Sequence, residues 1–119
     1  MSQAKTITQV LQAAKYIIEE VGWSQSAFFR DLQGHAIIGG QEAVEADYTQ
    51  LGSVCLEGAI NLVEADPELK SQTLEILGNM TRNKYGRYSS VLWFNDSVST
   101  TKQDVVALLD QAIEEERTR

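Results

Sequence analysis

The sequence predicts a mainly α-helical domain with four principal helices and a small β-hairpin or extended pair, and an α+β arrangement is the alternative. Apolar residues recur at spacings of three and four along several long stretches, which is the period of an amphipathic helix. Residues that cap helices stand at the starts of these stretches, and glycine follows the first of them. The hydrophobic share of 43%, together with eight glycines, is that of an ordinary globular protein.

The length sets the domain organisation. A chain of 119 residues has a common domain size, so we expect residues 1–119 to form a single globular domain. Such a chain can bury enough apolar surface to fold without disulfides or metals.

The first predicted helix covers residues 6–21. Thr6 and Gln9 form a capping-box pair at its start, and Gly22 stands where a helix commonly ends in a left-handed residue. The apolar residues that share one face are Ile7, Val10, Leu11, Ala14, Ile17, Ile18 and Val21.

Residues 23–50 lack a clear helical period. The sequence at 31–34 is typical of a turn, which favours a short hairpin over residues 27–38. Residues 41–48 are expected to form a loop or one helical turn. A second extended segment is expected at 88–94, which ends in the apolar run from Val91 to Phe94.

The second predicted helix starts after Gly52, with Ser53 as its N-cap. Its apolar face contains Val54, Cys55, Ala59, Ile60 and Val63. Gly58 lies inside this helix, where glycine costs about 1 kcal/mol relative to alanine. Close approach of another backbone or an aromatic ring would explain it, and our hypothesis is that the indole of Trp23 or Trp93 packs there.

The last two helices have clear starts. Asp66 caps one of them, Pro67 occupies its first turn, and Glu68 interacts favourably with the helix dipole. The final helix begins at Thr100 or Thr101. Its inward face contains Val105, Leu108, Leu109, Ala112 and Ile113.

The charge of the chain limits its partners. Ten Lys and Arg against 17 Asp and Glu give a net charge of −7, which phosphate backbones and anionic membranes repel. The densest basic stretch is Arg82, Lys84 and Arg87, which is small for a nucleic-acid site. No segment approaches the roughly 20 apolar residues that span a bilayer. We therefore expect no nucleic-acid partner and no membrane association.

The sequence favours a cytoplasmic location. Cys55 is the one cysteine, so no intrachain disulfide can form. No apolar segment of the kind found in secretory signals follows the first five residues.

Several short motifs resemble those of a bacterial and phage family of unknown function. In that family W-x-Q, C-x-x-G-A, W-N-D and V-x-x-L-x-x-A-I occur in this order. The matching segments here begin at Trp23, Cys55, Trp93 and Val105, and the turn glycine Gly34 also fits. This chain departs from the pattern at Phe94, which separates Trp93 from Asn95 and shifts the register of that turn. The resemblance covers nearly the whole chain and implies one globular unit of bacterial or phage origin, but no activity, cofactor or catalytic residue.

Cys55 is the first candidate for chemistry, because a thiol near a helix start can have a lowered pKa. The base would be His35, the one histidine, oriented by Asp96 or Asn95. A cysteine packed in the core explains the same position more simply. One His and one Cys are too few for a zinc site. The acidic stretches at 42–47 and 114–116 match no ligand loop, so we expect neither a metal nor a cofactor.

The sequence therefore favours a non-catalytic cytoplasmic interaction or accessory module, as a homodimer or with another protein. The alternative is a small-ligand binder or an enzyme with a cleft near Trp23, Gln25, Cys55, Trp93 and Asp96.

Overall fold

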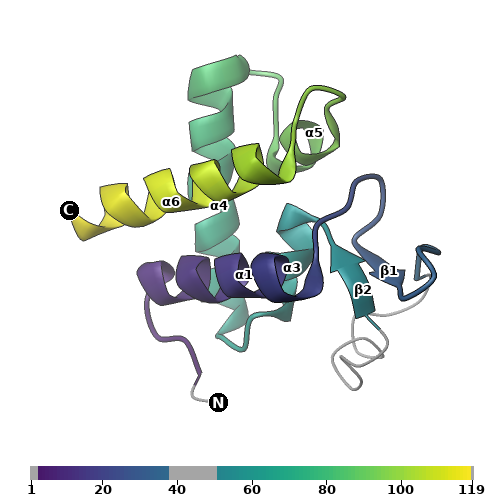
Figure 1. Ribbon diagram of the computed structural model, residues 1–119. Coiled ribbons are helices and arrows are strands. Elements are labelled where there is room, and N and C mark those ends of the chain that lie inside the picture. Colours follow the sequence, from purple (N-terminus) through teal and green to yellow (C-terminus); the bar gives the residue numbers. More distant parts are fainter. Residues whose placement is uncertain (1–2, 38–50, 119) are drawn as a thin grey trace.

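The computed structural model describes residues 3–37 and 51–118, and within them it is mainly helical with a two-stranded sheet. The elements are α1 (Ile7–Val21), β1 (Phe29–Asp31), β2 (Leu51–Val54), α3 (Leu56–Leu62), α4 (Pro67–Tyr85), α5 (Val91–Asp96) and α6 (Lys102–Arg117). Helix α1 packs against α3, α4 and α6. Figure 1 shows α1 and α6 running across α4, with the strands at one side of the helices and α5 beside the start of α6. The expected mainly α fold with a small antiparallel pair is confirmed.

Helix α1 follows its prediction closely. The Thr6 hydroxyl accepts a hydrogen bond of 3.1 Å from the Gln9 N–H. The Gln9 side chain returns this contact to the N–H of Lys5, one residue earlier than in a standard capping box. Gly22 ends the helix with a φ of 123°, a backbone angle that glycine adopts without a side-chain clash.

The core lies between α1 and the other helices. Val10, Leu11, Ala14 and Ile18 form the inward face of α1, and all four are fully buried. Apolar side chains from every other described helix and from both strands join them. The expected starts of α4 and α6 are also confirmed, because Asp66 caps α4 and Thr101 forms a reciprocal capping box with Asp104.

The expected hairpin at 27–38 is only part of the β-structure. Arg30 bridges Ala36 across the turn, and β1 also pairs antiparallel with β2. The prediction that the second helix begins after Ser53 is wrong, because residues 51–54 form this strand and Cys55 is the helix N-cap. Apolar Val54 fits both periods, so the sequence pattern did not separate strand from helix there. The segment expected at 41–48 lies outside the described residues.

The extended segment expected at 88–94 is also wrong, because residues 91–96 form helix α5. The hydroxyl of Ser90 accepts a hydrogen bond from the Trp93 N–H and so caps the helix. Val91, Phe94 and Asn95 are buried, whereas Leu92 and Trp93 are exposed, which is the spacing of a helix with one inward face. The polar inward residue, Asn95, concealed this period in the sequence.

Candidate functional site

Asn95 is the centre of a buried hydrogen-bond network. Its side chain is fully buried, and its Oδ1 accepts hydrogen bonds from the Trp23 indole N–H at 2.6 Å and from the Leu56 N–H at 2.9 Å. Its Nδ2 donates to the Ser24 carbonyl at 3.1 Å and to Asp96 Oδ1 at 2.9 Å. The orientation of the Asn95 amide is fixed, because its oxygen faces two donors and its nitrogen faces two acceptors. We call these contacts the Asn95 network.

Gln25 and Asp96 hold the same two chain segments together at the edge of this network. Gln25 Nε2 donates to the carbonyls of Asn95 at 3.0 Å and Ser97 at 2.9 Å. Asp96 Oδ1 also accepts the Ser26 N–H at 2.9 Å. Ser26 has a φ of 68°, which is uncommon for a residue other than glycine, and the Asp96 carboxylate holds it in that turn. Both polar side chains are therefore engaged in joining the segment after α1 to the end of α5.

Cys55 stands beside the network at the start of α3 and is fully buried. Its Sγ accepts a hydrogen bond of 3.2 Å from the Gly58 N–H, so the cysteine serves as the N-cap of the helix. Burial raises the pKa of the thiol to about 11, although the Gly58 N–H acts in the opposite direction. Desolvation therefore exceeds the effect of the helix start, and the thiol is protonated at neutral pH.

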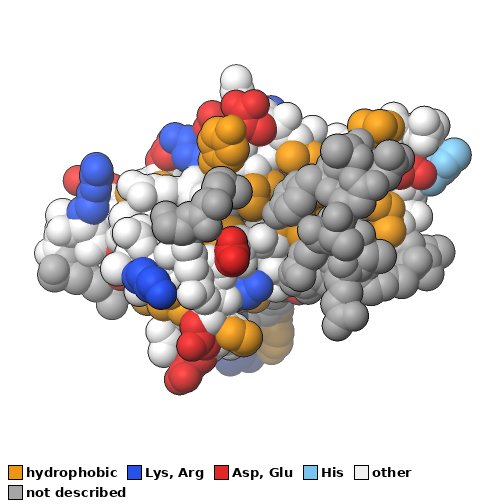
Figure 2. Space-filling view, turned by 90° about the horizontal axis from the view of Figure 1, so that it is seen from below, with side chains coloured by type: hydrophobic (Ala, Val, Ile, Leu, Met, Phe, Trp, Pro, Cys, Tyr) orange, Lys and Arg blue, Asp and Glu red, His pale blue; other side chains and the backbone are white. Residues whose placement is uncertain are grey.

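His35, the residue expected to act as the base for Cys55, lies at the surface. Its side chain is 80% exposed, and Nδ1 is 3.8 Å from Asp31 Oδ2. The one histidine, pale blue in Figure 2, projects at the edge of the face shown there. Among the described contacts the acid beside His35 is Asp31, while Asp96 bonds to Ser26 and Asn95.

Gly58 allows two backbones to approach closely. A Cβ at this position would lie 2.5 Å from the Phe28 carbonyl oxygen and 3.2 Å from the Phe29 ring. The same carbonyl accepts the Cys55 N–H at 3.0 Å. The expected close approach is present, but the hypothesis of a packed indole is wrong, since the nearest atoms belong to Phe28 and Phe29. The segment before β1 is drawn against α3 by a backbone hydrogen bond, which leaves no room for a side chain.

Trp93 lies outside the Asn95 network. Its ring is 5.8 Å from that of Tyr85, and Tyr85 stacks on buried Phe94 at 5.5 Å. Tyr85, Tyr88, Leu92 and Trp93 are all exposed large hydrophobic residues from the end of α4, the following turn and α5. We call these four residues the aromatic surface. Of the five residues expected to line a cleft, Trp23, Gln25 and Asp96 meet in the network, Cys55 lies beside it, and Trp93 belongs to the aromatic surface.

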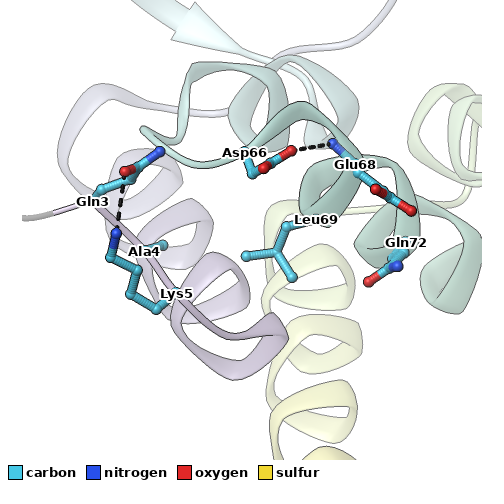
Figure 3. Close-up of a pocket in the computed structure, with 7 residues that line it drawn as sticks. All are labelled: Gln3, Ala4, Lys5, Asp66, Glu68, Leu69 and Gln72. Atoms are coloured by element: carbon cyan, nitrogen blue, oxygen red, sulfur yellow. Dashed lines mark hydrogen bonds between the residues drawn. The ribbon is translucent and has the colours of Figure 1, made fainter.

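Two surface hollows are formed by other residues. The larger, of about 430 Å³, lies between the N-terminal segment and the start of α4. Figure 3 shows Gln3 and Lys5 on one side of it, Asp66 and Glu68 on the other, and Leu69 between them. Both Gln3 and Lys5 are exposed, and Asp66 already caps α4. The smaller, of about 340 Å³, lies between Asn61 and the first turns of α4.

The described residues offer little for a metal ion. Within residues 3–37 and 51–118, no three His, Cys, Asp or Glu side chains group as metal ligands. In the same part of the chain, no helix has both the length and the apolar character required to cross a membrane.

Most residues of this site could be proposed from the sequence, but the central role of Asn95 could not. The sequence indicates Asn95 as a residue that could orient His35 and as part of the W-N-D motif, but not as the buried centre of a hydrogen-bond network. The available signal was the helical spacing of Val91, Phe94 and Asn95, which places the amide on an inward face. A buried amide needs several partners, and the polar residues after Trp23 could supply them.

Comparison with known proteins identifies the family. No curated protein and no solved structure matches the chain. A family model, described as a family of unknown function (DUF6197), matches residues 2–115. This match confirms the expected resemblance to a family of unknown function and spans nearly all of the chain. The protein belongs to the DUF6197 family.

Proposed function

We propose that this domain is a non-catalytic protein-interaction module of a bacterium or phage and that it acts in the cytoplasm. The observation that carries the proposal is the Asn95 network. Trp23, Gln25 and Asp96 were the polar and aromatic candidates for a cleft, and their hydrogen-bonding groups bind the Asn95 side chain and backbone groups. Groups satisfied in this way stabilise a fold, and a ligand would have to displace them.

The chemistry of Cys55 supports the same proposal. A nucleophilic thiol requires a lowered pKa or an adjacent base. Here burial raises the pKa to about 11, and the sulfur caps α3. His35 is largely exposed and has Asp31 as its neighbouring acid.

Composition supports the location and the class of partner. The net charge of −7 disfavours nucleic acid and anionic membranes. The lone cysteine fits a reducing compartment. The aromatic surface offers the kind of residues that are enriched at protein interfaces. The partner is another protein or a second copy of the chain.

Thiol modification tests the proposal against an enzyme or small-ligand binder with a cleft around Cys55. A small maleimide is added to folded protein at pH 7, and the rate is compared with that in 6 M guanidinium chloride. We expect labelling of the folded protein to be at least about a hundredfold slower, because the sulfur is fully buried. Rapid labelling of folded protein would contradict the proposal and favour the rival cleft. Light scattering over a range of concentrations shows in parallel whether the partner is a second copy.

A further inference from the structure

We propose that the aromatic surface binds an acidic protein segment that carries aliphatic side chains. This inference rests on the proposed function and names the surface and the partner. The surface consists of Tyr85, Tyr88, Leu92 and Trp93, and Lys84 and Arg87 lie on its border.

The first supporting observation is the exposure of these side chains. Tyr85, Leu92 and Trp93 are 43%, 43% and 48% exposed, and Tyr88 is 84% exposed. They come from one short segment that joins the end of α4 to α5. The rings of Tyr85 and Trp93 are 5.8 Å apart, and exposed apolar groups bordered by charges are characteristic of interaction sites.

The second observation is the separation of charge along the chain. Between Glu75 and Asp96 the sequence has Arg82, Lys84 and Arg87 but no acidic residue. The whole chain nevertheless has 17 Asp and Glu against ten Lys and Arg. The chain segment that forms the aromatic surface is therefore cationic within an acidic protein, and Lys84 and Arg87 lie over two of its rings. Its charge complements an acidic partner and opposes a symmetric contact with the same surface of a second copy.

The third observation separates a protein segment from single-stranded nucleic acid. Base stacking requires free faces of aromatic rings. Tyr85 stacks on Phe94 and has Lys84 Nζ 5.4 Å from its ring centre. The guanidinium of Arg87 lies 4.9 Å from the centre of the Tyr88 ring and donates to its hydroxyl at 2.8 Å. Cations and neighbouring rings already occupy these faces. Ring edges, which carry a partial positive charge, remain for aliphatic and carboxylate groups.

The fourth observation is that the surface is held in place before binding. Phe94 and Asn95 anchor the inner side of α5, so Leu92 and Trp93 project from a fixed helix. A surface arranged in advance loses less conformational entropy on binding.

Binding of short fluorescent peptides tests this inference. One peptide is amphipathic and contains Leu, Glu and Asp. The second has Lys at every acidic position, the third has Ser at every Leu position, and oligo(dT) is the nucleic-acid probe. We expect the acidic leucine peptide to bind at least about tenfold more tightly than the other three, with affinity that falls as salt is added.

Paired variants locate the binding surface. Lys84→Glu with Arg87→Glu, and separately Tyr88→Ala, should each weaken binding of the acidic leucine peptide by about tenfold or more. Lys102→Glu with Arg117→Glu makes the same change in net charge on α6, and Tyr16→Ala removes an exposed tyrosine from α1. These two controls should bind within about twofold of the unchanged protein, since surface charges elsewhere contribute little. Circular dichroism confirms that every variant is folded.

Three outcomes would overturn the inference. They are absence of binding by the acidic leucine peptide, equal loss in the control variants, and tighter binding of oligo(dT). Concentration-dependent dimerisation abolished by Tyr88→Ala would instead assign the surface to a second copy. If maleimide labels Cys55 slowly in the folded protein and no peptide binds, only the proposed partner is rejected. If Cys55 is labelled rapidly in the folded protein, the proposed function itself is rejected.

Discussion

The indole N–H of Trp23 donates a 2.6 Å hydrogen bond to Oδ1 of Asn95, a residue 72 positions later in the chain. The same oxygen accepts the N–H of Leu56 at the start of α3. One amide therefore joins the segment after α1, the first turn of α3 and the end of α5. Asn95 and Leu56 are both fully buried, so loss of the bond between them leaves an unsatisfied buried donor.

Asn95→Ala should lower the free energy of unfolding by about 3 kcal/mol or more, since it leaves the Trp23 indole and the Leu56 N–H without their acceptor. Urea denaturation measures the change. The matched control is Asn83→Ala on the exposed surface of α4, which should stay within about 0.5 kcal/mol of the unchanged protein. Equal effects of the two substitutions would refute a stabilising role for the network.

Two helical glycines should respond in opposite ways to alanine. Gly58→Ala places a Cβ 2.5 Å from the Phe28 carbonyl and should destabilise the fold by about 1–3 kcal/mol. At Gly78 the nearest atom to an added Cβ is the end of the Arg82 side chain at 3.2 Å, which can move aside. Gly78→Ala should therefore be neutral or stabilising by up to about 1 kcal/mol. Thermal denaturation of both variants checks the contrast, and a stabilising Gly58→Ala would contradict it.

Cys55 should make stability fall at alkaline pH. Burial raises the thiol pKa from an ordinary value of 9.0 to about 11, so the unfolded chain loses this proton at a lower pH than the folded protein does. Its contribution is fully present below pH 9.0 and is lost as the pH rises through about 11. Cys55→Ser keeps an N-cap acceptor but does not titrate in this range. The unfolding free energy of the unchanged protein and that of Cys55→Ser are compared from pH 8 to 11. The advantage of the unchanged protein should shrink or reverse as the pH rises. A constant difference would rule out the raised pKa of Cys55.

Glu57 should oppose stability when it is ionised. Burial raises the pKa of this carboxyl above its ordinary value of 4.5, so the folded state holds the proton to higher pH than the unfolded state does. The contribution of the protonated form is present below pH 4.5 and is lost as pH rises through the folded pKa. Glu57→Gln should thus increase stability at pH 7 and have less benefit at pH 4. Glu75→Gln, on the exposed part of α4, serves as the control in urea titrations at both pH values.

The helices with strong amphipathic patterns could be predicted from sequence, whereas elements defined by contacts far along the chain could not. Thr6, Asp66 and Thr101 mark helix starts through local hydrogen bonds, so nearby residues suffice to identify them. Strand β2 depends on pairing with β1, which lies about 20 residues earlier, and its short apolar pattern also fits a helix.

The candidate site was predictable as a set of residues but not as an arrangement. Trp23, Gln25 and Asp96 were singled out from the sequence because they were expected to face a ligand. Their actual partners are the Asn95 side chain and backbone groups, and the bonds of Trp23 and Gln25 and the bond from Ser26 to Asp96 span about 70 positions. Residues that are close together in the sequence do not indicate which residues, so far along the chain, they will contact. Gly58 is a second example. Its position inside a helix indicated the close approach of another group but did not identify that group as the Phe28 carbonyl.

The bond from Leu56 to Asn95 has a consequence for deuterium exchange. The first amides of a helix have no acceptor within the helix and usually exchange readily with solvent. The Leu56 amide instead meets a side chain 39 positions later, in a part of the fold that is sealed from water. Its hydrogen can leave only when α5 separates from α3, so this single helix-terminal amide reports the separation of these two helices.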